Sequence, residues 1–300
     1  MGDYRVRRSR AEDGRQGEVN AAAASPTASS STASVDAPKL AIRGIGKSFE
    51  KRTAQGRERT EILRGVDLDI RASEFVSIIG GSGSGKTTML RIIAGLVRAD
   101  QGTIALDGVP VTRPGRERAM VFQAINLLPW RNVLRNVEFG LELQRAERET
   151  RRDAALRYLD LVGLKEHAYS FPHELSGGMR QRVGIARALA TEPDVLLMDE
   201  PFGSLDAQTG EFLWDELLKI VDHTRKTVVF VTHHIDEAIY LSDRVVVLGE
   251  RPARIVETVD VPFAKPRWTY DVRAQPQFSA LRARLRARVF AGTGALASHG

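Results

Sequence analysis

The chain has 300 residues, with 44 Lys and Arg against 38 Asp and Glu, and its net charge of +6 is only a mild bias toward nucleic acid or anionic lipid. Its 42% hydrophobic and 27% charged residues are typical of a globular protein with a sizeable core, and charges interrupt every apolar run before it reaches membrane-spanning length. It has no cysteine, which excludes disulfides, thiolate metal sites and cysteine nucleophiles and fits a reducing compartment.

Residues 1–37 consist of a basic, polar head followed by the Ala-, Ser- and Thr-rich stretch AAAASPTASSSTAS. Neither half can bury a core, so we expect a disordered cytoplasmic tail. A secretory signal would place an apolar segment after the basic residues, whereas Ser, Thr and Pro interrupt the sequence here. The alternative interpretations are a solvated extension, a misassigned start and a segment that contacts a membrane.

From Leu40 onward the sequence alternates between short apolar runs and helical stretches. The runs are continuous and rich in β-branched residues, as in strands buried on both faces, and they are FVSII (75–79), VLLM (195–198), TVVFV (227–231) and RVVVL (244–248). Asp206 is suited to cap a helix whose apolar positions, Leu213, Leu217 and Val221, repeat every four residues. This alternation predicts an α/β fold with a mostly parallel sheet.

A glycine-rich segment directly follows the first of these strands. It fits the pattern G-x-x-x-x-G-K-[ST] and precedes an apolar helical stretch, MLRIIAGL. Glycines allow successive backbone N–H groups to curl around phosphate oxygens, and the following helix offers its N-terminus to the negative charge. The motif assigns Lys86 to the β- and γ-phosphates and the Thr87 hydroxyl to magnesium. The predicted nucleotide-binding residues are Gly80, Gly81, Ser82, Gly83, Ser84, Gly85, Lys86, Thr87 and Thr88.

The apolar strand VLLMDE ends in two carboxylates and supplies the second half of such a site. Asp199 is predicted to hold magnesium through water, and Glu200 is placed to orient and polarise the attacking water. An apolar strand followed by two acids is unremarkable alone. Paired with the glycine-rich loop, it indicates nucleotide hydrolysis.

LSGGMRQR, residues 175–182, precedes the apolar helical stretch VGIARALA. A helix N-terminus favours an anion, so Ser176 and the backbone of Gly177 and Gly178 are suited to grip one. In this position the segment resembles the signature motif of ATP-binding cassette (ABC) proteins. The resemblance implies a P-loop NTPase ABC cassette with a RecA-like core, an antiparallel β subdomain and a helical subdomain, in a head-to-tail homodimer that sandwiches two ATP molecules.

Other segments resemble the remaining family elements in their usual order, over roughly residues 40–262. Gln123 in VFQ resembles the Q-loop glutamine, which senses the γ-phosphate and the metal. Ser204, Leu205 and Asp206 resemble the D-loop, which meets the opposite nucleotide, and His233 in VTHH resembles the switch histidine on the γ-phosphate. The resemblance implies ATP and Mg²⁺ as cofactors. The predicted catalytic residues are Glu200, His233 and Gln123, and the predicted metal ligands are Thr87, Gln123 and Asp199.

Phe49 in KSFE resembles the aromatic A-loop residue that stacks on adenine, and a core phenylalanine is the alternative. The charged segment 51–60, KRTAQGRERT, is a hairpin-like insertion near the expected adenine pocket. It is interpreted either as a modest influence on base stacking or as a solvated loop, and we favour the solvated loop. Three residues depart from the family pattern. Gly81 and Ser84 replace the common Pro and Cys without harm to a backbone-built site, and His234 stands where many relatives have Asp.

The sequence distinguishes among the functional classes of ABC protein that a single cassette without membrane spans could belong to. Repair and chromosome ATPases insert a long coiled coil between the two halves, but the segment between Gln123 and Leu175 is short and carries no long heptads. Translation-factor relatives carry two cassettes, and this chain has one glycine loop and one LSGG. A transport cassette is therefore favoured, and a soluble non-transport ATPase acting on nucleic acid is the less favoured alternative.

The stretch QAINLLPWRNVLRNVEFGL resembles the nitrate/sulfonate/taurine importer group, in which LLPW followed by V-x-x-N-V is frequent, and LGERPARIVETVDVPFAKPR adds to the resemblance. In related importers the helical subdomain, here about 124–190, forms the groove for a permease coupling helix. The resemblance therefore implies that residues 127–130 are contact residues or the floor of that groove. Trp130 as an ordinary core residue is the alternative.

The expected domains are the tail 1–37, the ATPase domain 38–262 and a C-terminal extension 263–300. In the extension, Phe278, Leu281, Leu285 and Val289 share one helical face with arginines distributed around it. This pattern predicts a docked amphipathic helix, and contact with anionic lipid is the less favoured alternative.

The resemblance implies the ATP-hydrolysing subunit of an importer, peripheral on the cytoplasmic side of a bacterial inner membrane. The implied partners are a two-copy permease and an extracytoplasmic solute-binding protein, with no nucleic acid. The expected solute is an aliphatic sulfonate, taurine or nitrate, and another small solute is the alternative. The solute does not touch this subunit, so no residue here reads it directly.

Overall fold

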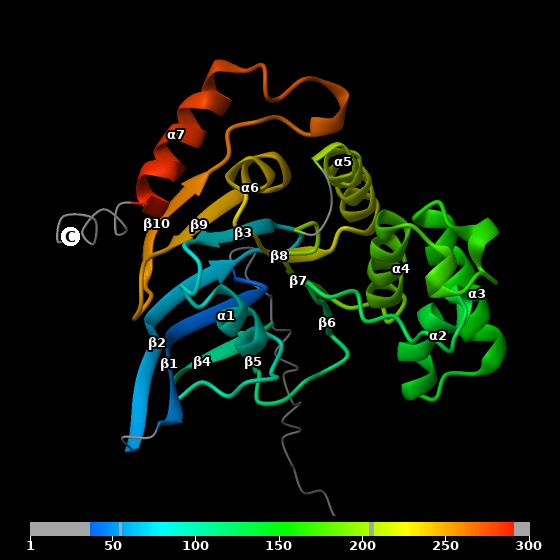
Figure 1. Ribbon diagram of the computed structural model, residues 1–300, viewed down its shortest axis with the longest axis horizontal. Coiled ribbons are helices and arrows are strands. Elements are labelled where there is room, and N and C mark those ends of the chain that lie inside the picture. The colour runs from blue at the N-terminus through cyan, green and yellow to red at the C-terminus, as the bar shows by residue number, and fades with distance from the viewer. Residues whose placement is uncertain (1–36, 54–55, 204–206, 291–300) are drawn as a thin grey trace, which may run out of the picture. The chain divides into compact units, whose positions relative to one another are not determined.

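The computed structural model describes residues 37–53, 56–203 and 207–290. Of the predicted tail 1–37 only the last residue falls within these ranges, and the predicted D-loop residues Ser204, Leu205 and Asp206 lie outside them. The described chain forms a smaller antiparallel sheet and a larger mixed sheet (Figure 1). The smaller sheet has the order β2-β1-β4-β5, with β1 (Leu40–Thr53), β2 (Gly56–Ile70), β4 (Gln101–Leu106) and β5 (Val109–Pro110).

The larger sheet has the order β10-β9-β3-β8-β7-β6 and is parallel except at the β9–β10 edge. Its strands are β3 (Phe75–Gly80), β6 (Arg118–Val121), β7 (Val195–Asp199), β8 (Thr227–Val231), β9 (Arg244–Leu248) and β10 (Ile255–Asp260). The predicted mostly parallel sheet is therefore confirmed. The β8 and β9 strands have the predicted bounds, while β3 and β7 each extend one residue further.

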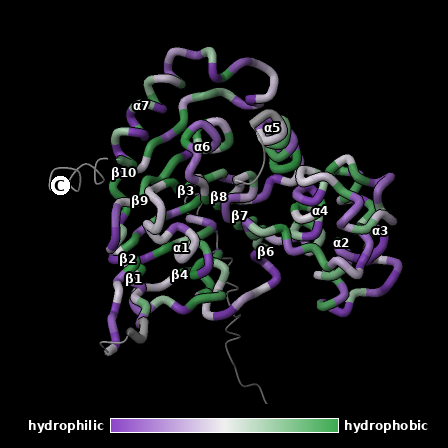
Figure 2. Tube along the Cα trace, in the orientation of Figure 1, coloured by the Kyte–Doolittle hydropathy of each residue, from purple (hydrophilic) through white to green (hydrophobic). Residues whose placement is uncertain are grey.

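Both faces of the larger sheet are buried because alternate residues of its strands enter two separate cores. Phe75 and Ile79 of β3 belong to one core, and Val76 and Ile78 belong to the other. The first core includes residues of the helices from α2 to α7. The second includes residues of α1 and of the smaller sheet. Figure 2 shows the hydrophobic segments concentrated in the strands between these layers. Continuous apolar runs are the sequence signature of strands covered on both faces.

Helices connect the strands and cover the larger sheet. They are α1 (Lys86–Ile93), α2 (Val133–Leu143), α3 (Arg148–Leu161), α4 (Gly177–Leu189), α5 (Ala207–Thr224), α6 (Ile235–Leu241) and α7 (Pro276–Phe290). Short 3-10 turns occupy Lys165–His167, Pro172–Glu174 and Arg267–Thr269. The α2, α3 and α4 helices pack on one another and form a group to the right of β6 and β7 in Figure 1. No helix among the described residues combines the length and apolarity needed to cross a bilayer.

The α7 helix packs against α6 and β9 (Figure 1). Its side chains Phe278, Leu281 and Leu285 are buried in the first core. Arg284 and Arg288 both pair with Glu257 on β10, at 2.5 and 2.9 Å. Much of the positive charge of this helix is thus engaged within the protein, and its apolar face is docked.

The insertion 51–60 lengthens the β1–β2 hairpin. Phe49 is opposite Thr60 in the antiparallel register, and the hairpin continues to the pair Thr53 and Gly56. The two strands lie side by side and project beyond the rest of the sheet (Figure 1). Segment 51–60 therefore extends this hairpin outward from the level of Phe49.

Candidate active site

The glycine-rich loop joins β3 to α1 and can be built only with glycine at several positions. Gly83 and Gly85 have φ values of 76° and 95°, in the left-handed region, and Gly85 is the N-cap of α1. A Cβ atom at Gly85 would lie 2.8 Å from a methyl carbon of Ile62. The loop lines a cavity of about 770 Å³, into which the N-terminus of α1 is presented. This is the cradle expected for phosphate oxygens.

Lys86 is folded back onto the loop that precedes it. Its Nζ donates to the carbonyl oxygens of Gly80 and Gly81, at 3.0 and 3.2 Å, and its side chain is buried. Burial lowers the pKa of Lys86, while the negative charges of Glu200 and Asp199 act in the opposite direction. The ammonium is therefore held at the floor of the cradle.

Thr87 meets Asp199, which lies at the carboxyl end of β7. The Thr87 hydroxyl donates to Asp199 Oδ1 at 2.9 Å. Burial raises the pKa of Asp199, and the hydrogen bond from Thr87 opposes that rise. Two predicted metal ligands far apart in sequence are thus in contact.

Glu200 is the meeting point of the predicted catalytic residues. Its Oε2 lies 3.0 Å from His233 Nδ1 and accepts a 3.4 Å hydrogen bond from Gln123 Nε2. Its backbone has a φ of 46°, and its N–H donates to the Val231 carbonyl at 2.9 Å. This turn aims the carboxylate into the cavity, which Glu200 and His233 both line. The structure therefore brings the three predicted catalytic side chains together.

A buried carboxyl supports the turn that carries His233, and the sequence analysis did not identify it. Glu237 on α6 accepts hydrogen bonds from the Thr232 hydroxyl and, at 3.1 Å, from Trp214 Nε1 on α5. Thr232 Oγ1 in turn accepts from the backbone N–H of His234 at 3.0 Å. Burial raises the pKa of Glu237 to about 7. Thr232 is close to Glu237 in sequence, but Trp214 reaches it from another helix, so the buried setting of this carboxyl is visible only in the folded chain.

His234 lies directly beside His233, the predicted switch histidine. Its ring centroid is 4.0 Å from that of His233. Burial lowers the pKa of His234, and the neighbouring His233 lowers it further. Both effects favour the neutral form of the His234 ring.

Phe49 lines the same cavity from β1 and is not a core residue. Its side chain is 45% exposed, and Lys47 Nζ lies 5.2 Å from the centre of its ring. An exposed aromatic face at the edge of a phosphate cradle is suited to stack on a base. The cavity also has walls that no motif predicted, formed by Ile62, Arg251, Val289 and Phe290.

The predicted signature residues lie outside the cavity of their own chain. Ser176 is the N-cap of α4, and its side chain accepts a hydrogen bond from the Met179 backbone N–H at 3.2 Å. Gly177 and Gly178 form the first turn of α4, and none of the three signature residues lines the glycine-loop cavity. This separation is what a site completed by a second copy requires.

The LLPW segment is a loop anchored in the core by Leu127 and supported by the buried side chain of Asn136. Asn136 on α2 is fully buried, and its Oδ1 accepts from Leu128 N at 2.8 Å. Its Nδ2 donates to the carbonyl oxygens of Leu128, Arg131 and Asn132, at 3.1, 2.9 and 3.0 Å. Trp130 is 73% exposed, so its interpretation as a core residue is wrong. The V-x-x-N-V asparagine therefore supports the loop that displays this tryptophan.

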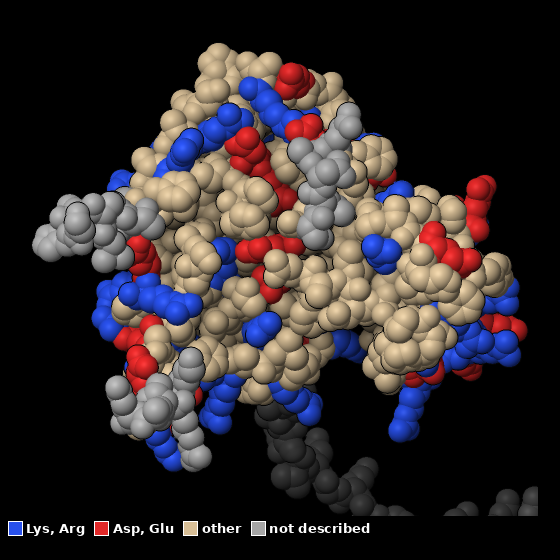
Figure 3. Space-filling model, viewed as in Figure 1, with Lys and Arg blue, Asp and Glu red and all other residues tan. Residues whose placement is uncertain are grey.

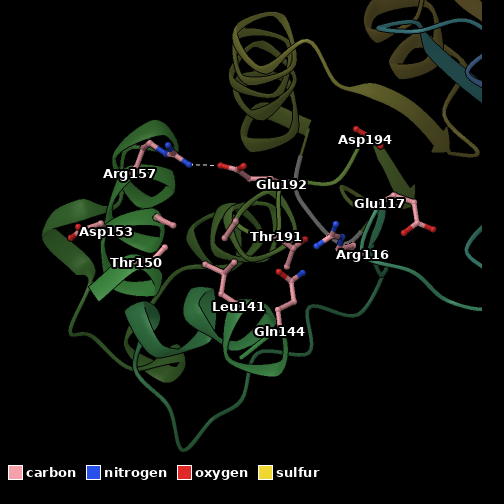
Figure 4. Close-up of a pocket in the computed structure, with 12 residues that line it drawn as sticks. Arg116, Glu117, Leu141, Gln144, Thr150, Asp153, Arg157, Thr191, Glu192 and Asp194 are labelled. Atoms are coloured by element: carbon pink, nitrogen blue, oxygen red, sulfur yellow. Dashed lines mark hydrogen bonds and ion pairs between the residues drawn. The ribbon is translucent and has the colours of Figure 1, made fainter. Parts of the chain in front are cut away.

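A second cavity, of about 820 Å³, lies near the N-terminal ends of β6 and β7 (Figure 4). Glu117 and Asp194 line it just before those strands begin, and Leu141 and Gln144 line it from α2. Arg157 on α3 and Glu192 are paired across it at 2.5 Å. None of the predicted catalytic, nucleotide or metal residues lies there. The cavity at the glycine-rich loop is therefore the candidate active site, because predicted nucleotide-binding residues, together with Glu200 and His233, line it.

Comparison with known proteins assigns the family. The family model described as ABC transporter matches residues 63–203. The chain is 49% identical over 226 residues to the taurine import ATP-binding protein TauB of Rhizobium johnstonii, covering 74% of this chain and 86% of that protein. It is 46% identical over 246 residues to the nitrate import ATP-binding protein NrtD of Synechocystis, covering 79% of this chain and 92% of that protein.

Solved structures show the same architecture. The dimeric structure of a bacterial ABC transporter cassette has a TM-score of 0.65 and 34% sequence identity, and it covers 75% of this chain and 100% of that chain. The dimeric structure of a post-hydrolysis state of that cassette, bound to ADP and Pi, gives the same values. The chain therefore belongs to the ABC transporter family and is an ATPase built on the P-loop cassette fold.

Proposed function

We propose that this protein is the ATP-hydrolysing subunit of an importer for a small anion, with taurine, another aliphatic sulfonate or nitrate as the transported solute. The observation that carries the proposal is the similarity to taurine and nitrate import ATP-binding proteins at 46–49% identity over most of both chains. The site geometry described above is consistent with the hydrolytic half of that function.

The proposed reaction transfers the γ-phosphoryl group of ATP to water. The water oxygen forms a bond to the γ-phosphorus, the bond to the β,γ-bridging oxygen breaks, and ADP and phosphate leave. Glu200 takes the proton from the attacking water, and its position 3.0 Å from His233 and 3.4 Å from Gln123 supports this role. His233 and Gln123 hold the carboxylate in place and contact the γ-phosphate end of the nucleotide.

The residues at the cradle fit a bound magnesium ion. The Thr87 hydroxyl, an Asp199 carboxylate oxygen and the Gln123 amide oxygen are the hard donors that this ion prefers, and the first two already meet at 2.9 Å. When bound, the ion neutralises charge on the β- and γ-phosphates. Lys86 holds the same phosphates from the floor of the loop. Phe49 stacks on the adenine.

Two copies are proposed to act together. Ser176, Gly177 and Gly178 lie outside their own chain's cavity at the N-terminus of α4, where Ser176 is exposed and Gly178 is buried. They are proposed to hold the γ-phosphate bound by a second copy. The dimeric form of the solved cassette supports this arrangement. Asp206, outside the described residues, is proposed to meet the opposite nucleotide.

The exposed Trp130 is proposed to contact a two-copy permease. A tryptophan that is 73% exposed on a loop fixed by Asn136 is a suitable anchor for another protein. The subunit is then peripheral, on the cytoplasmic side of a bacterial inner membrane, and an extracytoplasmic solute-binding protein delivers the anion. On the face shown in Figure 3, the basic and acidic side chains of the described residues are interspersed.

The test is growth of a strain lacking the gene on taurine or another alkanesulfonate as sole sulfur source, and on nitrate as sole nitrogen source. We expect a defect in one medium, rescued by the wild type and not by Glu200→Gln. The reconstituted complex should also show ATPase activity that the same anion stimulates. ATPase stimulation by DNA or ribosomes, without association with a permease, would refute the transport assignment.

A further inference from the structure

Arg251, in the loop between β9 and β10, holds the glycine-rich loop from the segment LGERPARIV, for which the sequence analysis predicted no role in nucleotide binding. Its Nε donates a hydrogen bond to the carbonyl oxygen of Gly83. Its Nη2 lies 2.7 Å from the point where a Cβ atom at Gly83 would sit, so the guanidinium packs directly against the backbone. Gly83 is thus required for this contact as well as for its left-handed φ.

The two terminal nitrogens of Arg251 keep their hydrogen-bonding capacity. No carboxylate among the described residues pairs with this side chain, although many of the other arginines pair with Asp or Glu. The side chain is exposed and lines the same cavity as the glycine-rich loop. An arginine anchored through Nε, with its terminal N–H groups unpaired, presents a fork suited to phosphate oxygens.

The charge balance of the cavity points the same way. The described residues that line it include two basic side chains, Lys86 and Arg251, and one carboxylate, Glu200. The Lys86 ammonium already donates to two loop carbonyl oxygens. Without Arg251 the remaining lysine and carboxylate would cancel, and the lining would offer no net positive charge to a polyanionic nucleotide.

We infer that Arg251 is a second cation of the nucleotide site, and that its terminal nitrogens contact the phosphate chain of the bound nucleotide. The inference rests on the proposed assignment of this cavity to ATP. Nε holds the guanidinium against the loop, so the fork is pre-organised before the nucleotide arrives. Arg251 is then a nucleotide-binding residue in addition to those of the loop itself.

The experiment is titration calorimetry of purified protein with Mg-ADP, which is not hydrolysed. Arg251→Ala should bind Mg-ADP about tenfold more weakly than the wild type, as expected for the loss of a charge-assisted hydrogen bond. Arg251→Gln keeps an N–H donor but no charge, and it should remain weak. Arg251→Lys should recover part of the affinity. The matched control is Arg254→Ala, a neighbouring exposed arginine that does not line the cavity, and its affinity should equal that of the wild type.

Further measurements separate the outcomes. AMP competes for the site with fewer phosphates, so Arg251→Ala should weaken AMP less than ADP. Equal affinity of Arg251→Ala and wild type for Mg-ADP would overturn the inference, and so would wild-type affinity in Arg251→Gln.

Lys86→Ala tests the assignment of the cavity itself: if it binds Mg-ADP as well as the wild type, the proposed nucleotide site is wrong. If Lys86→Ala is weak and Arg251→Ala is not, only the role of Arg251 is wrong. Thermal unfolding of each variant shows that the fold is intact.

Discussion

The replacement Glu237→Gln should make the protein more stable at alkaline pH. The carboxyl of Glu237 is buried between α5 and α6, where Thr232 and Trp214 donate hydrogen bonds to it. Burial outweighs these two hydrogen bonds and raises the pKa of this carboxyl to about 7. Glutamine has the same shape and is neutral at every pH, so it removes the cost of ionising this buried group.

The sign and size follow from proton linkage. The folded pKa of about 7 is roughly 2.5 units above the ordinary value of 4.5, so between these values the folded protein holds a proton that the unfolded chain has lost. The free energy of unfolding should therefore fall by about 1.4 kcal/mol per pH unit through this window, about 3 kcal/mol in all. His234, whose pKa is lowered, gives the opposite slope below pH 6.5. That contribution is common to both proteins and cancels in their difference.

The assay is urea unfolding of wild type and Glu237→Gln at intervals between pH 5 and pH 8.5. The stability of the wild type relative to the variant should decline by about 2.5 kcal/mol as the pH rises across this range, because part of the change occurs below pH 5. Glu166→Gln, at an exposed glutamate, is the matched control and should show no such trend. A difference between wild type and Glu237→Gln that stays constant with pH would refute the assignment of a raised pKa to this carboxyl.

Four other substitutions test the site and the fold. Glu200→Gln should retain ATP, trap a stable dimer and lose about 10²-fold or more in turnover, and a wild-type rate would show that the base is misassigned. Lys86→Ala should weaken nucleotide binding itself, as measured by displacement of a fluorescent ATP analogue. Phe278→Ala, in the buried face of α7, should lower the free energy of unfolding by about 3 kcal/mol in denaturant titration. Trp130→Ala should leave the stability and ATPase rate of the isolated subunit unchanged but abolish co-purification with the permease, and retained co-purification would refute its role as an anchor.

The sequence predicted the centre of the fold better than its edges. The strands around the nucleotide site are continuous apolar runs, because the sheet is covered on both faces, and such runs are visible without any structure. The strand β2 is harder to recognise because its first residues are exposed and only its later ones alternate between buried and exposed. The strands β5 and β10 are short or largely exposed, so little hydrophobic signal marks them.

The residues of the candidate site also fall into two groups: those that a local sequence pattern indicates and those that depend on tertiary contacts. The glycine-rich loop and the pair Asp199 and Glu200 depend on neighbouring residues in the chain, so a local pattern indicates them. Arg251 and Glu237 depend on contacts with segments far away in sequence, Gly83 in one case and Trp214 in the other. The segment LGERPARIV around Arg251 adds to the family resemblance but does not indicate its contact with Gly83, and no local pattern indicates the contact of Glu237 with Trp214.

The support of the LLPW loop by Asn136 has a consequence for how such a subunit adapts to new partners. All four hydrogen bonds of the Asn136 side chain have backbone partners, and Leu127 packs in the core, so this support of the loop does not involve the side chain of Trp130. Substitutions at Trp130 therefore change the surface offered to another protein while leaving its scaffold intact. The residue proposed to contact the permease is therefore distinct from the residue that supports the loop. The proposed docking surface can change at Trp130 without loss of the support that Asn136 gives.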